Sequence, residues 1–271
     1  MNRGLIIRTL REAWPATLAL SLVLLILQAA LAYVLPKFEA KMSQDWLQLD
    51  YVKAMFQTLL GTPVAGRLDI SIFHAIAWVH PVVLALASAH VLLLCTRVPV
   101  GEVDRGTVDV LLGLPVSRWE VFFSETVAWV FLGMLLMGAA AGGNAIGSLA
   151  LPPADRPDPA RVLIVLINLF ALYLTVGGLT WLISSLSDRR GAAITAVFLI
   201  LVALVLLDYL AQFWTTLEKF SFLSPLHYHR PILVLQRGTW PWKDLAVLGS
   251  CGAVLWLAGG VIFARRDLCT V

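Results

Sequence analysis

Two carboxylates fall inside long apolar stretches of this sequence, and they are the first candidates for chemistry. Glu125 and Asp208 each lie within a run of mostly apolar residues. Burying a charge in lipid is costly, so an ionisable residue in such a run is a functional candidate. Both lie near the end of their run, where a side chain can extend to the membrane interface. The sequence therefore favours an interfacial position over a catalytic one.

The histidines could form a path for a soft metal ion together with Cys95. They are His74, His80, His90, His227 and His229. On a helix, His80 and His90 would lie about 15 Å apart along the axis and about 80° apart around it. Those two cannot share one ion, and His227 with His229 would supply half a site at most. We therefore predict polar packing between helices and no metal site.

Motifs of hydrolytic enzymes and of nucleotide-binding proteins are absent from the sequence. It contains no HExxH, no GxSxG and no GxxxxGK[ST] phosphate loop. Cys95, Cys251 and Cys269 are far apart and form no CxxC pair, which argues against a disulfide framework or a zinc module. The chain is therefore not expected to be an enzyme or to hold a cofactor of its own.

The composition indicates a protein that lies in lipid. Hydrophobic residues make up 59% of the chain and charged residues 14%, whereas soluble domains are about half apolar and a quarter charged. The net charge of +3 gives no basic surface of the kind that binds nucleic acid. These values predict an integral membrane protein.

Six segments are long and apolar enough to cross a hydrocarbon core of about 30 Å. They are approximately Ala13–Leu35, Ile72–Thr96, Glu120–Leu149, Val162–Leu186, Ala192–Phe213 and Leu245–Ala264. The expected fold is an all-α integral membrane protein with one transmembrane domain over residues 1–271.

Two of these spans contain residues that predict local geometry. Pro81 lies inside the second span and should kink it or leave a carbonyl free. The third span has glycines at a spacing that suits close contact between helices. They are Gly133, Gly138, Gly142, Gly143 and Gly147.

Arginines and lysines in the short loops indicate the orientation. With the N-terminus inside, the inner basic residues are Arg3, Arg8, Arg11, Arg97, Arg105, Arg118, Arg189, Arg190, Arg265 and Arg266. The outer segments contain as many, but the inner ones are shorter and their arginines lie beside the span ends. We expect both termini in the cytoplasm and the chain in the inner (plasma) membrane. The start also fits a signal peptide cleaved after Ala30-Leu31-Ala32, although its apolar run is longer than usual.

Four segments outside the spans have patterns of their own. Residues 107–114 form a short amphipathic helix that Pro115 ends, and Ser117 with Glu120 fits a capping box for the third span. This helix could dock into a partner or rest at the lipid headgroups. Residues 2–12 and part of the outer segment 36–71 are amphipathic and interfacial. The outer segment 214–244 contains Pro225, Pro231 and Pro241, and fits a re-entrant or interfacial hairpin between spans five and six.

Four short motifs in this order resemble the type-2 permease subunits of ATP-binding-cassette (ABC) transporters. The main one is Glu102, then Gly106-Thr107 with Leu111-Leu112, then Pro115-Val116-Ser117-Arg118. The others are Ile183-Ser184-Ser185-Leu186 followed by Arg189-Arg190, then Leu223-Ser224-Pro225-Leu226, and finally Phe263-Ala264-Arg265-Arg266-Asp267-Leu268.

The resemblance implies a permease subunit of an ABC exporter that dimerises with a second copy or a homologue. A separate cytoplasmic ABC ATPase would hold ATP and Mg and would bind residues 101–118 as a coupling helix, with residues 1–12 as an elbow helix. The coupling residues would be Glu102, Arg105, Gly106, Thr107, Leu111, Pro115 and Arg118. Glu102 and Arg118 would position the helix by charge, Pro115 would fix its end, and Leu111 would fill a groove of the ATPase.

The resemblance leaves the substrate open. A non-transport membrane scaffold and an intramembrane enzyme that acts on lipid remain as alternatives.

Overall fold

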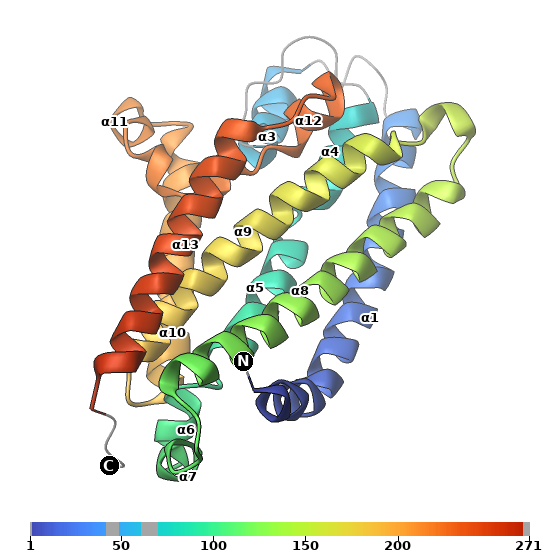
Figure 1. The fold of residues 1–271 in the computed structure, drawn as a ribbon. Helices are drawn as coiled ribbons and strands as arrows, with labels where there is room; N and C mark the ends of the chain where they lie inside the picture. Colours follow the sequence, from blue (N-terminus) through green and yellow to red (C-terminus); the bar gives the residue numbers. More distant parts are fainter. Residues whose placement is uncertain (1, 42–48, 61–69, 268–271) are drawn as a thin grey trace.

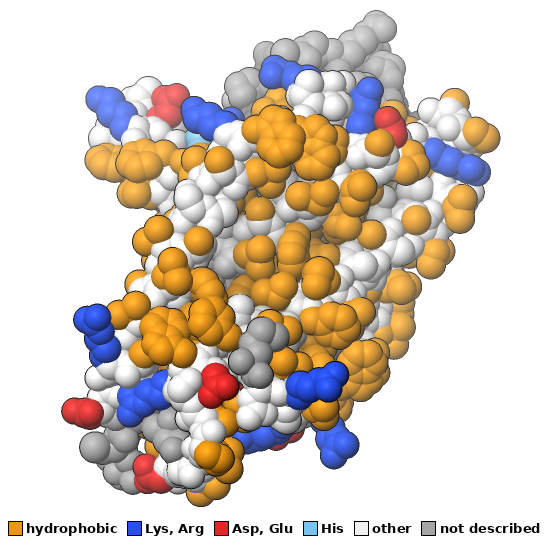
Figure 2. Space-filling model, in the orientation of Figure 1, with side chains coloured by type: hydrophobic (Ala, Val, Ile, Leu, Met, Phe, Trp, Pro, Cys, Tyr) orange, Lys and Arg blue, Asp and Glu red, His pale blue; other side chains and the backbone are white. Residues whose placement is uncertain are grey.

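The computed structural model describes residues 2–41, 49–60 and 70–267. Its helices are all α or 3-10, and the described residues contain no strand. Six helical segments are long and apolar enough to cross a membrane, which confirms the predicted number of spans. They are Arg3–Lys37, Ile70–Cys95, Arg118–Leu149, Pro153–Leu186, Arg190–Ala211 and Trp242–Arg265. Hydrophobic side chains cover the middle of the molecule, and arginines and lysines gather near its two ends (Figure 2).

The first span belongs to a helix longer than predicted. α1 (Arg3–Lys41) includes the expected elbow segment without a break and continues through Pro36 into the expected outer segment. Its first turns lie across the end of the bundle, at an angle to the rest of the helix (Figure 1). Pro15 lies inside α1 and removes one backbone hydrogen bond there, which allows such a change of direction.

The second span is divided at Pro81, as its sequence predicted. α4 (Ile70–Val79) ends before His80, and α5 (Pro81–Cys95) begins after it. The His80 ring accepts a hydrogen bond from the backbone of Val82 at 3.3 Å and so caps the new helix. The interruption leaves the Trp78 carbonyl available, and His229 Nε2 lies 3.4 Å from it.

Two helix pairs approach each other through glycine. α1 packs along α8 (Arg118–Leu149), and α9 (Pro159–Leu186) packs along α13 (Trp242–Arg265). A Cβ atom on Gly143 would lie 2.2 Å from the Leu25 carbonyl oxygen, and one on Gly178 would lie 2.4 Å from that of Gly252. The predicted glycine contacts of the third span are confirmed for Gly133, Gly143 and Gly147, whereas Gly138 and Gly142 face open space.

Short helices cover one end of the bundle. α3 (Asp50–Leu60) buries Val52, Phe56 and Leu60, and Phe56 packs edge-on against Phe73 of α4 with ring centroids 5.5 Å apart. Residues 42–48 and 61–69 of the outer segment 36–71 lie outside the described residues. The predicted outer hairpin contains α11 (Thr215–Glu218), η2 (Ser221–Leu223), η3 (Pro225–Tyr228) and α12 (Pro231–Arg237). α12 packs against α4 and α9, at the end opposite α6 (Val100–Asp104) and α7 (Val108–Leu112) (Figure 1).

Candidate functional site

The segment between the second and third spans forms two short helices and a tight turn. α6 ends at Asp104, and Gly106 has φ +67° before α7 begins at Val108. This left-handed conformation favours glycine, so the turn between α6 and α7 depends on that residue. Ser117 and Glu120 form the predicted capping box at the start of α8. The segment therefore begins and ends at defined points of the bundle.

Glu102 attaches this segment to the first turns of α1. Its side chain is 2% exposed and accepts hydrogen bonds from Arg8 at 3.0 Å, from Arg105 at 2.9 Å and from the Thr107 hydroxyl. Burial alone would raise the pKa of Glu102, but the Thr107 hydrogen bond and the charges of Arg8 and Arg105 outweigh it. The pKa therefore lies below the ordinary glutamate value, and the carboxylate stays ionised near neutral pH.

A chain of charged contacts continues from Arg8 toward the bundle. Arg8 also bonds Glu12 at 2.9 Å, and Glu12 pairs with Arg97, which lies just after α5, at 2.5 Å. Arg97 donates to the Thr9 carbonyl, and the Thr9 hydroxyl donates to Glu125 of α8. Glu125 is therefore buried in the contact between α1 and α8 and does not extend to the surface. The network joins α1, α8 and the start of the α6–α7 segment.

Arg118 attaches the other end of the segment to α13. Its guanidinium donates to the carbonyls of Phe263 and Arg266, at the C-terminal end of that helix. Arg266 in turn donates to the carbonyls of Ser185 and Ser187, and pairs with Asp188 in the turn before α10 (Arg190–Ala211). Arginines suit these positions because the last carbonyls of a helix lack backbone donors and carry partial negative charge.

The sequence also matches a known protein family over most of its length. A family model described as an ABC-2 family transporter protein matches residues 14–268. The chain belongs to the ABC-2 transporter family. A comparison with curated proteins finds no match. The chain is thus a multi-pass membrane permease, and ABC-2 membrane subunits are typically non-enzymatic and work with an ATPase partner in ABC transporters.

The permease exposes part of the α6–α7 segment at the end of the molecule. Val108 is buried, whereas Val110 and Leu114 are 73% and 46% exposed. Pro115 is exposed after α7. Leu111 falls within α7, but its side chain lies outside the described residues, so its expected contact remains a prediction. The described apolar surface of this segment is therefore formed by Val110 and Leu114.

Sequence-predicted site residues fall into two groups in the permease. Glu102, Arg105 and Thr107 meet in one cluster, whereas Arg118 bonds main-chain carbonyls on the α13 side. The sequence did not identify Arg8, Arg97 and Arg266 as partners. Their enrichment at the inner span ends was visible, but nothing in the sequence showed which groups they contact.

The histidines of the permease serve as polar contacts between elements. His90 lies 3.0 Å from the Thr17 hydroxyl and 2.9 Å from that of Tyr173, and so links α1, α5 and α9. His229 lies 2.7 Å from Asn168. Among the described residues, no group of three His, Cys, Asp or Glu side chains could hold a metal ion.

Proposed function

We propose that this permease is the membrane subunit of an ABC exporter and binds its ATPase through residues 101–118. The observation that supports this is the double attachment of the exposed α6–α7 segment. Glu102 attaches one end to α1 through Arg8, and Arg118, the first residue of α8, attaches the other end to α13. A force applied to Val110 and Leu114 would therefore reach both helix pairs of the bundle.

The mechanism follows from these two attachments. ATP and Mg would bind on the ATPase, and the change between its nucleotide states would displace α7. A bundle with two arrangements responds when the ATPase binds one arrangement more tightly than the other. The Glu102 cluster would carry the displacement to α1 and α8, and the Arg118 and Arg266 contacts would carry it to α13, α9 and the start of α10. The first turns of α1 would act as the elbow.

Orientation and assembly are parts of the same proposal. The arginines at the α6–α7 end favour the cytoplasmic side for that end and for both termini, in the inner membrane. α1 and α10 have exposed apolar faces, including Leu22 and Ile26 on α1 and Phe198 and Val202 on α10. These faces can contact lipid or the second permease copy of a dimer.

The test is to purify the tagged chain from its native host in mild detergent and identify the proteins that co-elute. We expect an ABC ATPase at equal stoichiometry. Leu114→Glu should remove it because a charge would replace an exposed apolar contact, a loss of about 2 kcal/mol or more if Leu114 is an anchor. Leu223→Glu is the matched control, since Leu223 is an exposed leucine on η2 at the other end.

A wild-type preparation without an ATPase would refute the proposal and favour a scaffold or a lipid-acting enzyme. Retention of the ATPase by Leu114→Glu, with the same recovery as the control, would reject the docking surface.

A further inference from the structure

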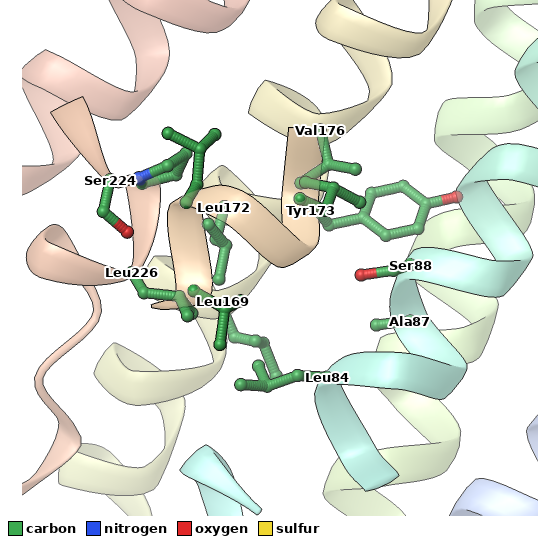
Figure 3. Close-up of a pocket in the computed structure, with 13 residues that line it drawn as sticks. Leu84, Ala87, Ser88, Leu169, Leu172, Tyr173, Val176, Ser224 and Leu226 are labelled. Atoms are coloured by element: carbon green, nitrogen blue, oxygen red, sulfur yellow. The ribbon is translucent and has the colours of Figure 1, made fainter. Parts of the chain in front are cut away.

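A groove with a volume of about 1100 Å³ lies between α5, α10 and α3. It exists because α10 makes its main contacts with α9, α6 and the short helices near its end, and leaves a space beside α5. A smaller cavity of about 80 Å³ adjoins the groove and shares Leu84, Ser88 and Leu201 with it. Figure 3 shows Leu84, Ala87 and Ser88 of α5 facing Leu169 and Leu172 of α9 across this recess.

Most of the groove is apolar. Its sides are formed by residues such as Leu84, Ala89, Leu201, Val202 and Val205. Along α10 the lining extends from Phe198 to Asp208 and beyond, which is at least about 15 Å at the helical rise. This shape fits a long apolar chain better than a compact polar solute.

One end of the groove is acidic because Asp208 lines it. This side chain is 18% exposed, and its one ion-pair neighbour among the described residues is His227, at 3.9 Å. The His227 nitrogen that faces Asp208 lies 2.9 Å from a nitrogen of Arg230. The same Arg230 nitrogen lies 3.2 Å from the other His227 ring nitrogen, and the 3.9 Å separation between His227 and Asp208 is too long for a hydrogen bond. No hydrogen-bond donor among the described residues therefore satisfies Asp208.

Aromatic rings lie at the same end of the groove. Tyr209 and Phe213 follow Asp208 on α10, with ring centroids 5.5 Å apart, and both line the groove. Tyr51 lines it from α3, which Gln212 holds to the end of α10 by a 3.0 Å hydrogen bond to the Thr58 carbonyl. The described lining contains no lysine or arginine, although Arg230, which bonds His227 outside the lining, also acts on Asp208 through its charge. A carboxylate beside aromatic faces attracts an ammonium group and disfavours an anion.

We propose that the groove binds an amphiphile with an ammonium head at Asp208 and an apolar tail along α5 and α10. This inference rests on the proposed transport function and names the substrate class that the permease would take.

The test measures binding to the full-length chain in lipid nanodiscs with two fluorescent probes. One is a dye-labelled dodecyl chain with a primary ammonium head, whose N–H groups can donate to Asp208, and the other is the same labelled chain with a sulfonate head. We expect the ammonium probe to bind and the sulfonate probe to bind at least about tenfold more weakly. Asp208→Asn should weaken ammonium binding about ten- to a hundredfold, as expected for loss of one charged contact, and should strengthen sulfonate binding because the repelling charge is gone.

Two further variants keep the test decisive. Asp244→Asn should bind both probes as wild type does, because Asp244 lines a separate pocket with Arg230 and Arg237. Val205→Trp should weaken binding of both probes by filling the apolar part of the groove. If Asp208→Asn does not fold, unchanged binding by Val205→Trp would show that the probes do not bind in the groove. Equal binding of the two probes, or wild-type ammonium affinity in Asp208→Asn, would overturn the inference. The absence of a co-purified ATPase would refute the transport proposal instead, and would leave this binding result intact.

Discussion

Replacement of Glu102 by glutamine tests the charged attachment of the α6–α7 segment most directly. The change removes the charge and keeps the size of the side chain. In the native structure the carboxylate accepts hydrogen bonds from Arg8, Arg105 and Thr107. Both arginines donate to one carboxylate oxygen and Thr107 donates to the other, so a glutamine can keep the arginine bonds at its amide oxygen and donate its NH₂ to the Thr107 hydroxyl. What the change removes is the negative charge between the two guanidinium groups, which turns two charge-paired bonds into weaker ones.

The exposure of the partners decides the size of the effect. A hydrogen bond to a charged group contributes about 1.5–3 kcal/mol, and removal of one member of a fully buried ion pair costs about 3–5 kcal/mol. Arg8 and Arg105 keep 43% and 50% of their side chains exposed, so water can solvate them after the change. We therefore expect a loss of about 2 kcal/mol, at the lower end of this range. For a chain of this size that lowers the melting temperature by about 4–8 °C.

The assay compares melting temperature and transport per ATP hydrolysed in the purified complex of permease and ATPase. Glu102→Gln should keep the ATPase bound, because Val110 and Leu114 are unchanged, and should lower the transport yield. Asp104→Asn is the control, since Asp104 is an exposed acidic residue of the same segment. The reasoning is refuted if Glu102→Gln matches this control in both measurements.

Four other outcomes are expected. Gly143→Ala should destabilise the bundle by about 2 kcal/mol or more, because its Cβ would meet the Leu25 carbonyl, whereas Gly142→Ala faces open space and should be neutral or stabilising in thermal melts. Gly106→Ala should lower the stability of the α6–α7 turn by about 1–2 kcal/mol because alanine disfavours a positive φ. No atom lies within 4 Å of the added carbon, so no steric clash contributes. The loss of stability should appear as faster proteolysis of the segment. Arg118→Ala should speed amide hydrogen exchange in the last turn of α13 about fivefold, for a loss of about 1 kcal/mol, and leave its first turn unchanged. After replacement of Cys251 and Cys269 by serine, spin labels at Leu18 and Met134 should keep their separation when ATP is added to the complex, whereas labels at Val82 and Leu206 should change theirs. Equal changes in both pairs would contradict this.

Some features of the fold could be predicted because their causes are local in the sequence. The six apolar runs, the break at Pro81 and the Ser117–Glu120 capping box each depend on residues within one segment. The point at which α1 ends could not be predicted, because an apolar run does not show where helical backbone stops. Pro36 was assigned to the outer segment, but the helix continues through it to Lys41.

The connections of the candidate site could not be predicted in the same way. Glu102 and Arg8 are separated by 94 positions, and the sequence does not show which helix faces meet. Arg118 was expected to act through charge, but its described partners are backbone carbonyls. Every residue has a carbonyl group, so such a contact leaves no signature in the sequence. The sequence therefore showed which residue types lie at the helix ends, whereas the structure was needed to show which groups these residues contact.

The packing of the bundle indicates where a displacement of α7 would have its effect. In the α1–α8 and α9–α13 pairs, backbones meet at glycines, and such close contacts resist relative movement because any shift brings main-chain atoms into collision. Between α5 and α10 the apolar groove separates the helices, so movement there breaks few contacts. The α6–α7 segment is attached to both rigid pairs, and α6 also packs against α10. The first residue of α10, Arg190, bonds Thr96 and the Leu93 carbonyl at the end of α5, and so holds that end of the groove together. We therefore expect a push on α7 to move the pairs as units and to widen or narrow the groove that contains Asp208.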